Sequence, residues 1–75
     1  MLKEKYLFLS FDIPREKASF RVKIWRRLKE IEARQKLGSY WMLSYSKQNL
    51  NNLKKIVKQI KKSKGRAEII VGRLI

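Results

Sequence analysis

The sequence has no cysteine and no histidine, and only six of its residues are Asp or Glu. Without cysteine a disulfide framework is excluded, and without either residue type so is a Cys/His zinc site. A histidine general base is excluded for the same reason. Neither a glycine-rich phosphate loop nor a paired-carboxylate motif is present. The chain therefore offers little material for catalysis.

Long hydrophobic runs are also missing. The charged start of the chain is followed by an apolar run of only about eight residues, which is too short to span a membrane. That run lacks a small-residue cleavage site, so a signal peptide is not indicated. We expect a cytoplasmic protein that does not act at a membrane.

Acidic residues are absent from a long central segment. Between Ala33 and Ala67 there is no Asp or Glu, although ten Lys or Arg occur there. These ten are Arg34, Lys36, Lys47, Lys54, Lys55, Lys58, Lys61, Lys62, Lys64 and Arg66. The formal net charge is +14 on 75 residues, which favours a polyanionic partner because each phosphate contact releases a counterion. An acidic membrane surface, or charge that serves solubility alone, are the alternatives.

The length predicts a single domain, residues 1–75, with a core that is marginal without oligomerisation. Hydrophobic residues make up 44% of the chain, with two Trp, three Tyr and three Phe, too many for a disordered basic tail. Residues 6–13 read as a strand that ends at Pro14. Alternation places Leu7, Leu9 and Phe11 on one face. The other face receives Tyr6, Phe8, Ser10 and Asp12.

Two amphipathic helices are predicted, one from about Arg15 to Ala33 and one from Ser46, a good N-cap residue, to about Lys64. The apolar stripe of the first contains Ala18, Val22, Trp25, Leu28 and Ile31, widened by Phe20 and Ile24. That of the second contains Leu50, Leu53, Ile56, Val57 and Ile60. The opposite faces are basic, with Arg15, Lys23, Arg26, Arg27 and Arg34 on the first and Lys54, Lys55, Lys58, Lys61 and Lys62 on the second. Gly65 is a credible stop for the second helix.

The segment 35–45 reads as one bent strand or a hairpin that turns at Gly38-Ser39, and residues 67–75 as the last strand. Strand, helix, strand or hairpin, helix, strand is the order of an α+β, ferredoxin-like split βαβ sandwich, with two helices on one face of an antiparallel sheet. The other sheet face is then open, with Tyr6, Phe8, Tyr40 and Met42 on it. Exposed aromatic residues of this kind indicate a homodimer interface, or a surface on which bases stack.

Asp12 ends the first strand, where a carboxylate suits Mg²⁺ or Mn²⁺. An Asp before a Pro and a helix start is also a common cap or turn residue, and the residues alone favour this role over metal binding. One Asp cannot build a metal site alone, but a two-fold dimer would bring a second copy opposite it. Trp25 and Trp41 both fall on faces assigned to the core, so packing is favoured over base stacking for them.

Three segments resemble the second core CRISPR-associated protein family, here called the Cas-two family: Phe11–Pro14, the basic helix Arg21–Leu28 and the strand Tyr40–Leu43. Regulators of the PaaX type carry a similar strand end, matching Ser10–Pro14. Regulators of the ChrB type carry a similar helix, matching Arg21, Trp25, Arg26 and Leu28, and a later strand to which Gly38, Tyr40 and Leu43 correspond loosely. The element order agrees over nearly the whole chain, and the specific motifs cover about a third of it.

The resemblance implies a ferredoxin-like fold, homodimerisation and contact with nucleic acid. In CRISPR members the dimer is the centre of a spacer-integration complex, and some members are metal-dependent nucleases whose strand-end aspartate matches Asp12. The family's second strand usually contains a Glu that Lys36–Leu43 lacks. Members usually continue beyond the last strand into a segment that packs on the partner, so the manner of dimerisation here stays open.

The sequence thus predicts a nucleic-acid-binding homodimer that acts mainly as a scaffold, within a larger nucleoprotein complex. The binding residues are expected to be Arg26, Arg27, Lys54, Lys55, Lys58, Lys61 and Lys62. Three alternatives are a Mg²⁺- or Mn²⁺-dependent endonuclease that uses Asp12 of each protomer, a regulatory domain related to the two regulator families, and a monomeric RNA binder. The last lacks the Lys/Arg-Gly-aromatic signature of RNA-recognition modules.

Overall fold

A computed structural model describes residues 4–37 and 40–73 of the chain. Its elements are β1 (Tyr6–Asp12), a 3₁₀ turn η1 (Arg15–Lys17), α1 (Ala18–Glu30), β2 (Arg34–Lys36), β3 (Tyr40–Ser44), α2 (Lys47–Lys62) and β4 (Arg66–Gly72). The segment 35–45 is therefore a hairpin and not one bent strand. The predicted turn at Gly38-Ser39, like residues 74–75 at the end of the last predicted strand, lies outside the described residues.

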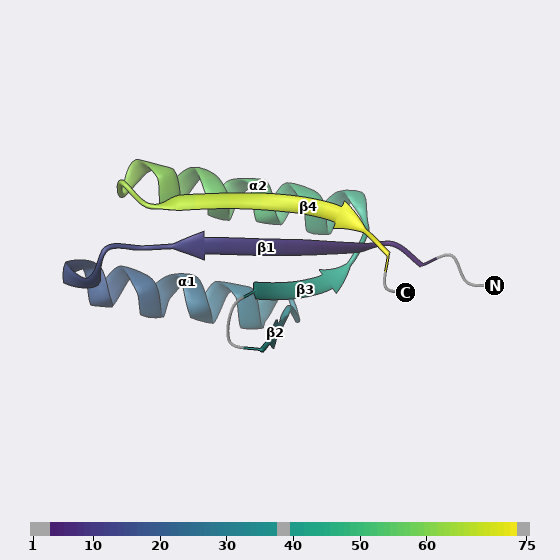
Figure 1. Cartoon of the computed structure of the whole chain (residues 1–75), viewed down its shortest axis with the longest axis horizontal. Coiled ribbons are helices and arrows are strands. Elements are labelled where there is room, and N and C mark those ends of the chain that lie inside the picture. The colour runs from purple at the N-terminus through teal and green to yellow at the C-terminus, as the bar shows by residue number, and fades with distance from the viewer. Residues whose placement is uncertain (1–3, 38–39, 74–75) are drawn as a thin grey trace.

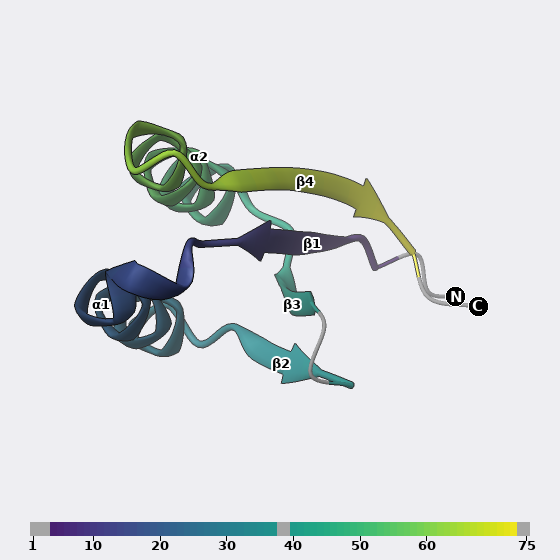
Figure 2. The same ribbon diagram turned by 60° about the vertical axis from the view of Figure 1, so that its left-hand side comes forward.

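The four strands form one antiparallel sheet in the order β2-β3-β1-β4. Both helices cover the same face of this sheet, α1 beside β1 and β3 and α2 behind β4 (Figures 1 and 2). This is the ferredoxin-like split βαβ arrangement predicted from the element order. None of the described helices is long and apolar enough to cross a membrane.

The core lies between the sheet and the two helices. Alternation along the strands turns Leu7 and Leu9 of β1 and Trp41 and Leu43 of β3 toward the helices, and all four are buried. The helices contribute Ile24, Leu28, Leu53, Ile56 and Ile60, which are also buried. Phe11 packs against this cluster while remaining partly exposed. The predicted core face of β1 is therefore confirmed.

The apolar stripe of α1 is centred differently from the prediction. Ile24 and Leu28 are fully buried and Phe20 and Ile31 pack beside them. Val22 is 49% exposed and Trp25 46% exposed, because these two lie on the flank of the helix that faces away from α2, beyond the buried stripe. The expectation that both tryptophans belong to the core is wrong for Trp25 and right for Trp41, which is 4% exposed.

Both helices end in a Schellman motif whose left-handed residue is not glycine. After α1 the Ala33 N–H donates to the carbonyl of Leu28, and Glu32 has a φ of 64°. After α2 the Gly65 N–H donates to the carbonyl of Ile60 at 2.9 Å, and Lys64 has a φ of 66°. The second helix thus ends at Lys62, earlier than predicted. The first also begins later than predicted, at Ala18, because η1 follows Pro14.

The N-terminus of α2 agrees with the sequence. Ser46 is its N-cap, and the Ser46 hydroxyl oxygen accepts a hydrogen bond from the Asn49 N–H at 3.0 Å. The Asn49 side chain in turn donates to the carbonyl of Ser44 at 2.8 Å, which ties the start of α2 to the end of β3. These bonds fix the start of the helix that carries five of the seven predicted binding residues.

Candidate nucleic-acid interface

The outer face of α2 is a row of exposed lysines. The five predicted binding residues on this helix, Lys54, Lys55, Lys58, Lys61 and Lys62, are all exposed. They face outward because Leu53, Ile56 and Ile60 of the same helix are held in the core. No acidic residue occurs in α2. The helix therefore presents positive charge with no compensating carboxylate of its own.

The outer face of α1 adds to this surface. Arg26 is exposed and Arg27 partly buried. Both line a shallow groove of about 350 Å³ along α1, together with Ser19, Val22, Lys23 and Glu30. Because α1 and α2 cover the same face of the sheet (Figure 2), their outward sides belong to one layer of the molecule. We call the outward sides of α1 and α2, with the seven predicted basic residues, the helix-layer surface.

Asp12 lies on the opposite, open face of the sheet. It is exposed, and in the β1–β4 register it pairs with Arg66, while Glu68 stands on the same face two residues along β4. These residues share a shallow depression of about 320 Å³. Arg66, the cross-strand neighbour of Asp12, adds positive charge at this edge of the sheet and so opposes cation binding there, because like charges repel. Among the described residues no cluster of three acidic side chains could hold a metal ion.

The capping interpretation of Asp12 is wrong. Pro14 occupies the N-cap position of η1 and Lys17 that of α1, and neither helix start has a side-chain capping bond. The 3₁₀ turn between β1 and α1 moves the start of α1 six residues beyond Asp12, out of capping reach. Asp12 is therefore an exposed carboxylate at the strand end.

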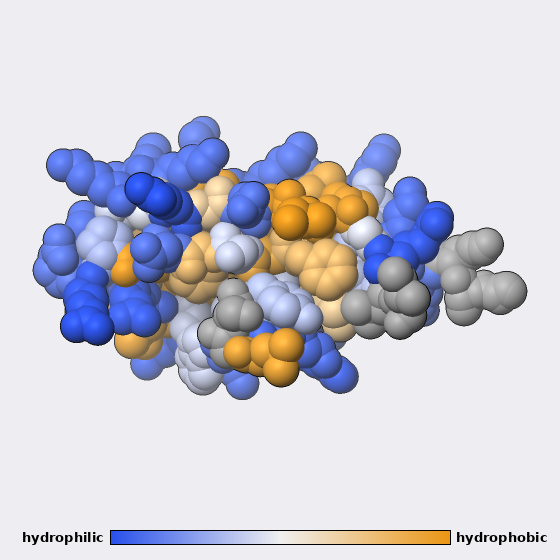
Figure 3. All heavy atoms as spheres, viewed as in Figure 1, coloured by the Kyte–Doolittle hydropathy of each residue, from blue (hydrophilic) through white to orange (hydrophobic). Residues whose placement is uncertain are grey.

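The open sheet face contains the predicted interface residues, all partly buried: Tyr6, Phe8, Tyr40 and Met42. Phe8 and Tyr40 meet edge to face, with ring centroids 6.0 Å apart. Figure 3 shows apolar atoms gathered over β1 and β4 within a polar border. Tyr6 lies near the end of this face, where its hydroxyl donates a 2.6 Å hydrogen bond to the Glu4 carboxylate.

Sequence reasoning missed Ile70 on this face. The β1–β4 register places it opposite Phe8, and it is 55% exposed. With Phe8, Ser10 and Tyr40 it borders a hollow of about 420 Å³. The only signal in the sequence was the unbroken apolar run Ile69–Val71. Such a run is consistent with a strand covered on both faces, but it does not say which Ile points away from the helices.

Comparison with models of known protein families gives no match, and a search of curated proteins finds no relative either.

Proposed function

We propose that this protein binds nucleic acid through the helix-layer surface and acts as a homodimeric scaffold, as its resemblance to the Cas-two family implies. The observation that carries the proposal is α2, a helix with five exposed lysines and no acidic residue. Lys54, Lys58 and Lys61 recur at intervals of four and three residues, so their stems are spaced about 6 and 4.5 Å along the helix axis. A row of this kind follows a phosphate backbone well.

Repulsion within α2 supports a polyanionic partner. Lys54 and Lys58, and Lys58 and Lys62, are like charges one turn apart, and each such pair destabilises a helix by about 0.2–0.5 kcal/mol. The helix contains no carboxylate that would offset this cost. Phosphates bound along the row would remove the repulsion, and the released counterions would add to the affinity.

A lipid surface fits α2 less well. A basic helix that lies on a membrane inserts an apolar face beside its charges. In α2 the apolar residues Leu53, Ile56 and Ile60 are buried against the sheet and are not free to insert. Nucleic acid requires only the exposed charges, so it is the partner that we propose.

The test is the salt dependence of duplex DNA binding, measured by fluorescence anisotropy. One variant replaces Lys54, Lys58, Lys61 and Lys62 by Gln. A control variant replaces four exposed basic residues away from the helix-layer surface by Gln: Lys5, Arg34, Arg66 and Arg73. Each variant therefore loses four positive charges. We expect the first variant to flatten the slope of log affinity against log salt by up to about 3.6, at about 0.9 per phosphate contact. Equal losses in the two variants would show that net charge, and not this surface, determines binding.

The proposed dimer would form through the open sheet face. This face lies opposite the helix layer (Figures 1 and 2), so self-association would leave the basic surface free for nucleic acid. Exposed apolar side chains such as Ile70 need a partner in a chain with so small a core. We expect Ile70→Lys to give a monomer of about 9.1 kDa in sedimentation. Val22→Lys, which is similarly exposed but on α1, should remain dimeric; a monomeric unsubstituted protein would contradict the proposal.

A further inference from the structure

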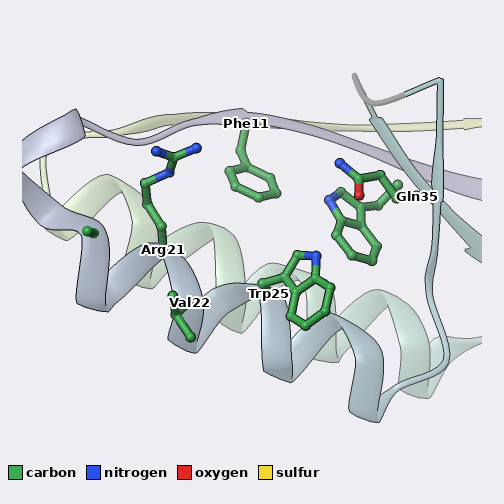
Figure 4. A pocket seen from close by; sticks show the side chains of 7 residues that line it. Phe11, Arg21, Val22, Trp25 and Gln35 are labelled. Atoms are coloured by element: carbon green, nitrogen blue, oxygen red, sulfur yellow. The ribbon is translucent and has the colours of Figure 1, made fainter.

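An aromatic cleft opens beside α1 on the helix side of the sheet, where it adjoins the helix-layer surface at Val22. Its volume is about 470 Å³, within the usual range of small-ligand sites. The lining residues are Phe11, Ala18, Arg21, Val22, Trp25, Gln35 and Trp41. Figure 4 shows Arg21 and Trp25 reaching from α1, Phe11 hanging from β1 and Gln35 entering from β2. Three aromatic rings, one guanidinium and one amide therefore meet in a single hollow.

The sheet registers explain why this cleft is open. β1 pairs with β3 as far as Leu9 and Trp41, but with β4 it continues to Asp12. Phe11 therefore lies beyond the paired part of β3, and its ring borders open space. Gln35 pairs with Trp41 across β2 and β3 and so faces the helix side at the sheet edge. Trp25, on the outer flank of α1, forms the remaining wall.

The two tryptophan rings of the cleft meet edge to face. Their ring centroids are 6.5 Å apart with an interplanar angle of 78°, and Trp41 is buried whereas Trp25 is 46% exposed. The Lys29 ammonium lies 4.8 Å from the centroid of the Trp25 ring. The buried indole holds the exposed one in place, and the Lys29 ammonium adds positive charge beside it. The exposed indole is therefore suited to stacking on a planar ring that lies close to negative charge.

The polar groups narrow the ligand chemistry. Arg21 and Trp25 are four residues apart on one flank of α1, so a group stacked on the indole would have its anionic substituent within reach of the guanidinium. The Gln35 amide offers both a donor and an acceptor, which the edge of a nucleobase can use. A nucleobase with its phosphate combines all three features: a planar ring, an adjacent anion and a hydrogen-bonding edge.

We propose that this cleft holds one unpaired nucleotide of a single-stranded segment, with its base against Trp25 and its phosphate on Arg21. The proposal rests on the proposed nucleic-acid binding and adds a preference for single strands or frayed ends. Bases inside a duplex are stacked and paired and cannot enter the cleft. The helix-layer surface would hold the continuing backbone, because α1 contributes to both.

The test compares two oligonucleotides of equal charge, a twelve-residue oligothymidylate and its fully abasic analogue, with tryptophan fluorescence as the readout. We expect the oligothymidylate to bind about 5- to 100-fold more tightly and to quench the fluorescence, as one stacked base would. Trp25→Ala should abolish this ratio and Trp25→Phe should largely retain it. Arg21→Gln should lower the ratio, whereas Lys23→Gln, which removes the same charge from α1 outside the cleft, should lower both affinities alike and leave the ratio unchanged.

Equal affinities of the unsubstituted protein for the two oligonucleotides would overturn the cleft assignment, as would a ratio that survives Trp25→Ala. Quenching by benzoate without quenching by the oligothymidylate would overturn it too, in favour of a free aromatic acid. Salt-dependent binding of blunt duplex DNA measured in parallel separates the two proposals, since it would persist if only the cleft assignment failed. Trp25→Phe and Arg21→Gln keep the test decisive if Trp25→Ala does not fold.

Discussion

Replacing Gly65 by Ala should strongly destabilise the fold, although it adds one methyl group. A Cβ at this position would stand 2.7 Å from the carbonyl oxygen of Asp12 and 2.8 Å from Cγ2 of Ile60. Gly65 is therefore required for space, where the end of α2 passes the end of β1. The left-handed residue at the end of α2 is Lys64, not Gly65.

The magnitude follows from the contacts. The oxygen of Asp12 belongs to the backbone, so β1 and the turn after α2 would have to separate by about 0.7 Å to reach ordinary contact distance. Overpacking of this kind costs about 1–3 kcal/mol. The bond from the Gly65 N–H to the carbonyl of Ile60 would weaken as well, adding about 1 kcal/mol. A total of about 2–4 kcal/mol should lower Tm by roughly 10–25 °C in a domain of this size.

Thermal unfolding followed by circular dichroism at one fixed protein concentration would measure this loss. Gly72→Ala is the matched control, because a Cβ there would lie 3.6 Å from the Phe8 ring, an ordinary contact. Its stability should be unchanged or slightly higher, since alanine has less backbone freedom to lose than glycine. If Gly65→Ala and Gly72→Ala had the same Tm, the close approach of α2 to β1 would be refuted.

Three further predictions concern individual side chains. Ser46→Ala should remove the N-cap of α2 and lower stability by about 1 kcal/mol, with Ser46→Asp restoring it in the same melts; no loss in Ser46→Ala would mean that the cap is not formed. The hydrogen bond to Glu4, followed by repulsion from the Glu4 charge, raises the pKa of Tyr6 above its ordinary value of 10.0, so the bond stabilises the fold below pH 10 and this stabilisation is lost as the pH rises through the raised pKa. Glu4→Gln should return the pKa of Tyr6 toward 10, measured by absorbance at 295 nm with Tyr6→Phe as the reference. A Tyr6 pKa that does not change in Glu4→Gln would contradict the hydrogen bond. Because Arg66 faces Asp12, we expect Mg²⁺ not to raise Tm and Asp12→Asn to leave Tm unchanged. A rise in Tm with Mg²⁺ that is absent in Asp12→Asn would instead support the metal-dependent nuclease.

Much of the architecture could be predicted because it depends on local patterns. The alternation in β1 identified Leu7 and Leu9 as buried, and the spacing of Leu53, Ile56 and Ile60 fixed which side of α2 would carry the lysines. Once apolar residues repeat at the period of an element, burial of that face leaves the charged side chains in solvent. The lysine face of α2 was therefore predictable residue by residue.

The first helix shows where such patterns stop. Its seven apolar positions span more of the circumference than one sheet can cover, so periodicity alone could not say which edge of the stripe would be exposed. The structure exposes Val22 and Trp25, because β2 and β3 are short and leave that flank of α1 uncovered. An apolar stripe wider than its contact surface is resolved only by tertiary packing.

The sequence by itself determined the charge, the element order and the two amphipathic faces, since these follow from composition and from the periods of helix and strand. Only the tertiary structure decided which residues from distant segments meet. The strand registers set Ile70 opposite Phe8 and Arg66 opposite Asp12, and they bring Gln35 of β2 to the cleft formed by Phe11, Trp25 and Trp41. A register shifted by one residue would turn every side chain of a strand to the other face, and no local pattern records which register the assembled sheet adopts.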